Sequence, residues 1–268
     1  MLYEQPRLYD AIYDGFTEDI EFYIDLCGPG PVCELACGSG RVTIPLAKAG
    51  CTVTGVDAQP EMVSAARERA RAAGLGAEDA EVAAGGATVG ADGAGAAGES
   101  SAKGAGRVSF RVGDMREAQG EESFSSMIVP LHSLSHLLTT DDLLQALRSM
   151  HRSLKPEGRL AVALHNPDPA YLAQRGEGLE RIHRDLANVA LYEVAHYHSD
   201  TQILDLKWYV ETAEETTMVP CQLRMIFPEE LLLLLCAAGF QIDARYGWYD
   251  KSPFGPDSGT QIVVARRP

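Results

Sequence analysis

Short apolar runs alternate with amphipathic stretches along most of the chain. The apolar runs are rich in valine, isoleucine, leucine and alanine, as buried strands of a mainly parallel sheet are. Several of the stretches between them open with proline or threonine and stop at glycine, which is typical of helices. The pattern predicts strands within residues 31–36, 51–57, 107–114, 125–131, 159–166, 240–246 and 260–267, and helices at 41–49, 60–73, 140–154 and 228–238.

This alternation predicts an α/β fold. Strand–helix repeats build a doubly wound, Rossmann-like sheet with helices on both faces. A length of 268 residues suits one domain with elaborations. We therefore expect a single domain over residues 1–268.

Three segments depart from the alternation. Residues 1–27 are rich in aromatic side chains and predict an N-terminal helical lid. Residues 76–106 are mostly alanine and glycine, which bury too little surface to offset the entropy of ordering, so a flexible insertion is expected there. Residues 189–226 carry β-branched and aromatic residues with turn signals between them. They predict a small antiparallel cap inserted before the last long helix.

Composition narrows the classes of partner. The net charge is −15, from 23 basic and 38 acidic residues, which argues against nucleic acid as the main partner. No basic leader and no apolar run of about 20 residues is present, so a cytoplasmic protein without a membrane segment is expected. The six cysteines form no C-x-x-C pair and no cluster has metal-ligand spacing, so reduced thiols and no metal are expected.

The stretch "ELACGSG" at residues 34–40 lies where the first strand meets the first helix of the alternation. Ligands of open α/β sheets bind at such strand ends. The dinucleotide fingerprint G-x-G-x-x-G does not fit this turn. Glu34 also places a carboxylate where a pyrophosphate would have to lie. The turn therefore favours a positively charged ligand, and S-adenosylmethionine carries both a sulfonium and an ammonium group. A nicotinamide-dependent oxidoreductase is the rival that the failed fingerprint counts against.

Two further acids follow the next two strands. Asp57, after the second strand, is suited to accept both ribose hydroxyls of a nucleoside. Asp114, after the third, could accept the adenine amino group, with the backbone amide of Met115 beside it. An aspartate after a strand is often only a turn former, but three acids at three successive strand ends form an ordered set.

Several stretches resemble class I S-adenosylmethionine-dependent methyltransferases: "ELACGSGRVTIPLAKAG", "VTGVDAQPEMVSAAR", "VGDMRE", "LKPEGRL" and "AAGFQI". The resemblance covers most of the chain outside the alanine- and glycine-rich insertion. It implies a seven-stranded sheet with the last strand antiparallel, S-adenosylmethionine as cofactor and S-adenosylhomocysteine as product. Ala36 stands where many members have glycine. The implied cofactor-binding residues are Tyr9, Tyr13, Glu34, Ala36, Cys37, Gly38, Ser39, Gly40, Asp57, Ala58, Met62, Asp114, Met115 and Leu131.

Within that class the chain is similar to small-molecule and peptide N-methyltransferases. This implies methyl transfer to a small-molecule or short-peptide acceptor, with an amine expected. O-methylation of a small metabolite, or ligand binding without catalysis on the same fold, stays open. Tyr9 and Tyr13 resemble aromatics that close over the cofactor, although ordinary helix packing explains them equally well.

Candidates for the acceptor side follow the fourth and later strands. His132 and His136 in "PLHSLSHLL" are the catalytic candidates, to accept a proton or orient the acceptor, or only to shape the loop. The substrate-binding candidates, each with a structural alternative, are His165, Asn166, Trp248 and Tyr249. Cys37 has no neighbouring histidine in sequence and is not expected to be a nucleophile. The edge of the inserted strands leaves a homodimer open.

Overall fold

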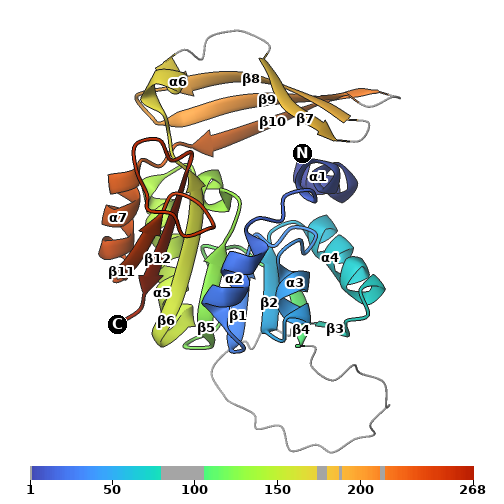
Figure 1. Cartoon of the computed structure of the whole chain (residues 1–268), viewed down its shortest axis with the longest axis vertical. Coiled ribbons are helices and arrows are strands. Elements are labelled where there is room, and N and C mark those ends of the chain that lie inside the picture. Colours follow the sequence, from blue (N-terminus) through green and yellow to red (C-terminus); the bar gives the residue numbers. More distant parts are fainter. Residues whose placement is uncertain (1, 80–105, 174–179, 187–188, 212–214) are drawn as a thin grey trace, which may run out of the picture.

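The computed structural model describes residues 2–79, 106–173, 180–186, 189–211 and 215–268. They form a main sheet flanked by helices and a second sheet that lies across one end of it (Figure 1).

The main sheet has the strand order β11-β12-β6-β5-β1-β2-β4-β3. Strand β12 runs antiparallel to both of its neighbours, whereas the pairs from β6 to β3 are parallel. The predicted mixed sheet with an antiparallel last strand is therefore confirmed, and β3 is a short extra strand at the edge. The strands are β1 (Pro31–Leu35), β2 (Thr52–Asp57), β3 (Ala77–Asp79), β4 (Val108–Val112), β5 (Phe124–Val129), β6 (Leu154–His165), β11 (Gln241–Tyr246) and β12 (Thr260–Arg266).

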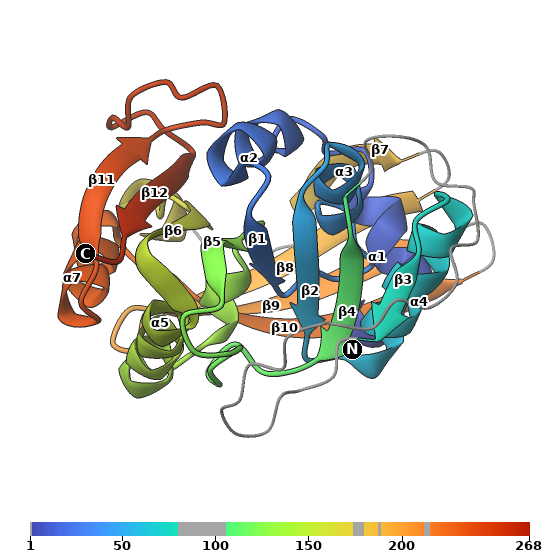
Figure 2. The same cartoon turned by 90° about the horizontal axis from the view of Figure 1, so that it is seen from below.

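Helices cover both faces of this sheet. Side chains of β1 alternate between the two cores: Val32 packs on one face, and Cys33 and Leu35 pack on the other. This period of two is what a strand buried on both faces requires. Figure 2 shows α2 and α3 on one face and α5 on the other. The first core contains α2 (Ile20–Cys27), α3 (Thr43–Lys48) and α4 (Pro60–Ala72), and the second contains α5 (Thr140–Ser153) and α7 (Pro228–Ala237).

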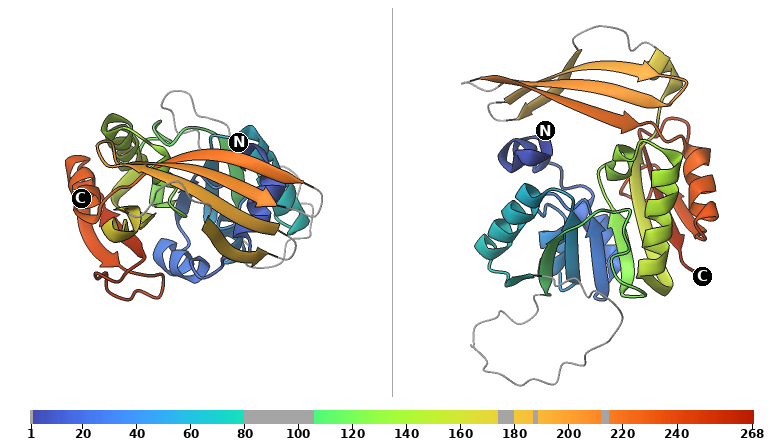
Figure 3. Two further views of the ribbon diagram at one scale, coloured as in Figure 1. Left: turned by 90° about the horizontal axis from the view of Figure 1, so that it is seen from above. Right: turned by 180° about the vertical axis from the view of Figure 1, so that it is seen from behind.

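The second sheet, called the cap here, is antiparallel throughout, with the order β10-β9-β8-β7. Figure 3 shows it lying over one end of the main sheet. The predicted antiparallel strands within residues 189–226 are present, but the cap begins earlier, with a strand that the sequence pattern did not reveal. Its strands are β7 (Glu180–Leu186), β8 (Val189–His198), β9 (Ile203–Glu211) and β10 (Thr216–Arg224).

The N-terminal segment lies between the cap and the main sheet (Figures 1 and 3). The one-turn helix η1 (Leu2–Glu4) and helix α1 (Pro6–Tyr13) pack through Leu2 and Ile12 against the buried face of the cap. The predicted helical character of residues 1–27 is present, and its role as a lid stays a prediction. Two further short helices are η2 (Ser133–His136) and α6 (Pro169–Ala173).

Most of the predicted insertion at residues 76–106 lies outside the described residues, which include only its first four positions and its last one. Positions 77–79 form β3 and pair with β4. Among the helices that the structure describes, none is long and apolar enough to cross a bilayer.

Candidate functional site

A tight loop connects β1 to α3, and the chain folds back on itself there. Ala36 and Gly38 both adopt left-handed backbone conformations, with φ of 53° and 55°. A methyl group on Gly38 would lie 3.2 Å from the ring atom Cε1 of Tyr9 in α1. Gly38 therefore allows both the turn and the close approach of an aromatic ring from the N-terminal helix.

Asp57 ties this loop to the end of β2. Its Oδ2 accepts a hydrogen bond from the backbone N–H of Gly38 at 2.8 Å, and its Oδ1 accepts one from Gln59 at 2.9 Å. The side chain is nearly buried, and burial raises its pKa from the usual value. Each oxygen keeps a further lone pair that a ligand hydroxyl can use.

A cavity of about 700 Å³ lies over the ends of β1, β2 and β4, with α1 and the cap strands β9 and β10 around it. Its size is in the range of small-molecule and cofactor sites. Ten of the sequence-predicted site residues line it: Tyr9, Tyr13, Ala36, Gly38, Asp57, Ala58, Asp114, Met115, Leu131 and His136.

Five predicted cofactor residues lie next to this cavity but do not line it. Glu34 is 2% exposed, accepts a hydrogen bond from the Thr43 hydroxyl, and has its pKa raised to about 8 by burial. Ser39 donates a hydrogen bond to Asp10 of α1. These contacts hold the loop in place from behind, so the direct cofactor contact expected of these residues stays a prediction. The five are Glu34, Cys37, Ser39, Gly40 and Met62.

Asp114 reaches the same cavity as one half of an ion pair. The guanidinium of Arg116 approaches its Oδ2 at 2.6 Å and lowers the pKa of that carboxyl. Arg116 also contacts Asp142 of α5 at 2.8 Å. Asp114, the predicted acceptor for the adenine amino group, is therefore already paired with Arg116.

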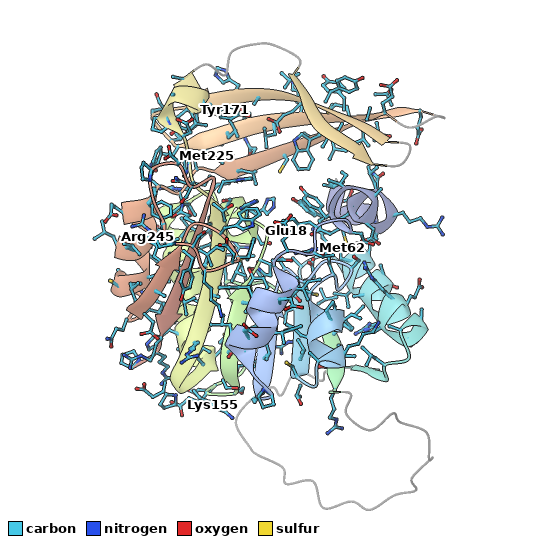
Figure 4. All side chains as sticks on the ribbon, viewed as in Figure 1. Glu18, Met62, Lys155, Tyr171, Met225 and Arg245 are labelled. Carbon is cyan, nitrogen blue, oxygen red and sulfur yellow. The ribbon has the colours of Figure 1, made fainter. Side chains whose placement is uncertain are left out.

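A second cavity of about 570 Å³ adjoins the first. The two share Tyr13, Leu131, Leu206 and Trp208 in their walls. Tyr171 and Met225, which also line the second cavity, are labelled in Figure 4 where the cap meets the main domain. The predicted acceptor-side residues that line it are His132, His165, Asn166, Trp248 and Tyr249.

Two comparisons agree with this geometry. Residues 33–162 match the methyltransferase domain family. Over 195 residues the chain is 29% identical to the putative methyltransferase YqeM of Bacillus subtilis, covering 69% of this chain and 65% of that relative. Residues 33–162 are therefore a methyltransferase domain, and the chain is similar to S-adenosylmethionine-dependent methyltransferases of class I. The prediction of this class and of its cofactor is confirmed, and the nicotinamide alternative is set aside.

Solved methyltransferase structures share the whole fold. The CcbJ methyltransferase from Streptomyces caelestis superimposes with a TM-score of 0.73 at 23% identity, covering 93% of this chain and 88% of that one. The S-adenosylmethionine-bound structure of CalS10, an amino pentose methyltransferase from Micromonospora echinaspora, gives a TM-score of 0.65 at 19% identity and covers 97% of each chain. The cap is therefore part of an architecture found in other methyltransferases.

The residues of this methyltransferase fit the cofactor of its class. The Asp57 carboxylate lines the first cavity, and Gly38 leaves room where a side chain would intrude. An acidic lining of this kind suits a ligand that carries a sulfonium and an ammonium group. Among the residues that the structure describes, no group of three or more histidine, cysteine, aspartate or glutamate side chains could hold a metal ion.

The two candidate catalytic histidines of the methyltransferase lie in different cavities. Nε2 of His136 is 2.8 Å from the Tyr3 hydroxyl in the first cavity, and burial lowers the pKa of this imidazole to about 4. In the second cavity, the ring of His132 stacks on His165 with centroids 3.3 Å apart. Burial also lowers the pKa of the His165 imidazole to about 4. His136 and His165 are therefore neutral at pH 7 and weak as proton acceptors.

The other acceptor-side candidates combine cavity and structural contacts. The Asn166 amide donates to the backbone oxygen of Ser258 at 2.7 Å. The Trp248 indole donates to Glu18 at 3.0 Å, and Tyr249 packs edge-on against Phe16. Each of these residues lines the cavity and also supports a neighbouring segment. Their contact with an acceptor stays a prediction.

Sequence reasoning missed two charged groups at the site. Glu193 on β8 lines the second cavity and accepts a hydrogen bond from the Trp208 indole at 2.8 Å. Arg41, just after the glycine-rich loop, forms a buried ion pair with Asp19, the N-cap residue of α2, at 2.6 Å. The sequence did hold one indication for Glu193: it lies between Leu191 and Ala195, at a position where the alternation of the strand predicts a buried side chain. No comparable pattern pointed to Arg41.

Proposed function

We propose that this protein transfers a methyl group from S-adenosylmethionine to an amino group of a small molecule. The observation that supports this most is the pair of adjoining cavities with a common wall at Tyr13, Leu131, Leu206 and Trp208. A cofactor in one chamber and an acceptor in the next can meet at that wall in the alignment that methyl transfer needs.

The first cavity is proposed to hold the cofactor. In this arrangement Asp57 binds the ribose hydroxyls, and the loop at Ala36 and Gly38 runs along the methionine part. Met115 and Leu131 contact the adenosine, while Tyr9 and Tyr13 cover the cofactor from the N-terminal helix. The strands that lead into the main-sheet residues of this set lie side by side in the order β5-β1-β2-β4, so their carboxyl ends open onto the same cavity.

When bound, S-adenosylmethionine supplies a methyl group on a sulfonium, which an acceptor lone pair takes as the carbon–sulfur bond breaks to leave S-adenosylhomocysteine. The protein's part is to align the acceptor and exclude water. His136 and His165, neutral at pH 7, can orient polar groups without adding charge next to a cation. The proton released by a methylated ammonium leaves to solvent.

An amine is favoured over a hydroxyl acceptor for two reasons. A neutral amine needs no strong base, and His136 and His165 are weak bases because burial lowers their pKa values to about 4. The second cavity also contains a carboxylate, Glu193, that suits a basic nitrogen. The amino pentose methyltransferase CalS10, which shares the fold, acts on an amino compound by its description, and that role is carried here only as part of the proposal.

The test is a product assay with S-adenosylmethionine and a panel of amines, each paired with the alcohol of the same skeleton. Mass spectrometry of the products shows whether nitrogen or oxygen is methylated, and the amount of S-adenosylhomocysteine gives the turnover. We expect methylated amines from the native protein and at least about a hundredfold lower rate from Asp57→Ala. Methylated alcohols without methylated amines would instead establish O-methylation. Cofactor binding without any product across the panel would establish a binding protein.

A further inference from the structure

We propose that the acceptor is a lipophilic amine and that Glu193 holds its basic nitrogen inside the second cavity. This inference rests on the proposed function and goes beyond it by naming the class of acceptor. It follows from the walls of the cavity, from the position of Glu193 on the cap, and from the aromatic rings around it.

The walls of the second cavity are largely apolar. They include side chains from three separate parts of the chain, among them Phe16, Leu172, Leu204, Leu223 and Met225. A polyhydroxylated acceptor would leave hydroxyl groups without hydrogen-bond partners against such walls, at a cost of about 1–3 kcal/mol for each. A hydrocarbon or aromatic body would gain from burying the same surface. The cavity therefore selects for a lipophilic acceptor.

Glu193 stands out on the apolar inner face of the cap. It shares this face with Leu191 and Ala195, and Trp208 lies directly opposite it in the neighbouring strand. It is 8% exposed and is the only buried polar or charged side chain within the described parts of β8, β9 and β10. Burying a carboxylate costs free energy that a cationic ligand offsets. The bound ammonium gives up its proton to solvent before methyl transfer, because only the neutral amine has a lone pair that can take the methyl group. The hydrogen bond from the Trp208 indole fixes its orientation at the cavity wall.

Aromatic rings around the same cavity suit a basic nitrogen as well. Trp208, Trp248 and Tyr249 all line it. A cation held near such rings gains about 0.5–2 kcal/mol from the negative faces of the ring systems. The cavity is lined by two carboxylates: Asp168 is exposed and accepts a hydrogen bond from the backbone N–H of Ala170, whereas Glu193 is buried on the cap. A buried carboxylate and several aromatic faces are the elements by which a protein recognises an ammonium group attached to an apolar body.

The chain's tryptophans make a direct binding test available. It has only two, Trp208 and Trp248, and both line the second cavity. Quenching of tryptophan fluorescence therefore reports on this cavity without any methyl transfer. The protein is first saturated with S-adenosylhomocysteine, and then phenylbutylamine, phenylbutanol and glucosamine are titrated in turn.

We expect saturable quenching by phenylbutylamine, with at least about tenfold weaker binding of phenylbutanol and glucosamine. In Glu193→Gln, which keeps an acceptor for the Trp208 indole, the advantage of the amine over the alcohol falls to about twofold or less. Calorimetric affinity for S-adenosylhomocysteine stays unchanged in that variant. Glu211→Gln is the matched control, because it removes the same charge from an exposed position at the end of β9.

Three results would overturn this inference: glucosamine binding as tightly as phenylbutylamine, no quenching by any probe, or an undiminished amine advantage in Glu193→Gln. The proposed function fails separately, when the product assay yields methylated alcohols and no methylated amine. If amines are methylated while Glu193→Gln keeps its preference for them, only the role of Glu193 is wrong.

Discussion

Glu34 is a carboxyl group buried behind the glycine-rich loop, with Thr43 donating a hydrogen bond to it. Burial raises its pKa from the usual 4.5 to about 8. In the protein without ligand, its contribution to stability is therefore complete below pH 4.5 and is lost as the pH rises through about 8. A cation bound nearby favours the ionised carboxylate and reverses this preference.

We therefore expect the preference for S-adenosylmethionine over S-adenosylhomocysteine to grow as the pH rises from about 6.5 to 9. A change of about fivefold in the ratio of the two dissociation constants corresponds to about 1 kcal/mol of charge interaction. Calorimetric titrations of both ligands at several pH values measure this ratio. In Glu34→Gln it should not change with pH. A constant ratio in the native protein would show that Glu34 does not sense the sulfonium charge.

Single residues were predictable where a local signal marked them. Asp57 follows a clear strand and lies where a nucleoside-binding acid belongs in such folds. Asp114 was found for the same reason, but its pairing with Arg116 depends on side-chain geometry that the spacing does not determine. Glu193 was missed because its strand shows only a short alternating pattern. A charged residue at a position that should be buried suggests that the alternation has been assigned to the wrong face, not that the residue has a function.

Among the elements, α2 is joined to the glycine-rich loop by the ion pair between Arg41 and Asp19. Arg41 is 5% exposed and Asp19 is fully buried, and Arg41 also donates to the backbone oxygen of Phe16 at 2.7 Å. Removing one partner leaves a buried charge without its counter-ion. This pair therefore fixes the start of α2 against the end of the glycine-rich loop.

Arg41→Met is expected to lower the free energy of unfolding by about 3–5 kcal/mol in urea denaturation. The control Arg266→Met removes a more exposed arginine, which pairs with Glu157 and Asp243, and should lower the free energy of unfolding much less. The double variant Asp19→Leu/Arg41→Met should recover part of the loss, because no buried charge remains. Equal losses for Arg41→Met and Arg266→Met would contradict this account of α2.

The alternating elements were predictable because each carries its own pattern. The predicted segments for the long strands and helices overlap those observed, with shifts of a few residues at most of the ends. The exception is β6, which begins at Leu154 instead of Arg159, because "LKPEG" looks like a helix stop and nevertheless continues into the strand. The edge strand β3 is too short to show a period, and β7 carries the polar-rich sequence "ERIHRDL". Both are paired through backbone bonds that side-chain patterning does not encode.

At the scale of the whole molecule, the site is assembled from segments that are distant in sequence. Tyr9, Asp57 and Leu206 line one cavity although they come from the N-terminal helix, the main sheet and the cap. The sequence predicted that the carboxyl ends of the strands would meet. The division into two cavities depends on how the cap and α1 pack over those ends, and this is why His132 and His136 separated although they are four residues apart.

The central claim is that the first cavity binds S-adenosylmethionine through Asp57. The most direct measurement is calorimetric titration of S-adenosylmethionine into the native protein and into Asp57→Ala, with Asp57→Asn included to preserve the side-chain shape. We expect micromolar binding that weakens at least about fiftyfold in Asp57→Ala, because hydrogen bonds between a carboxylate and the ribose hydroxyls are lost. Binding of equal strength in all three folded proteins, or no binding to the native protein, would contradict the account.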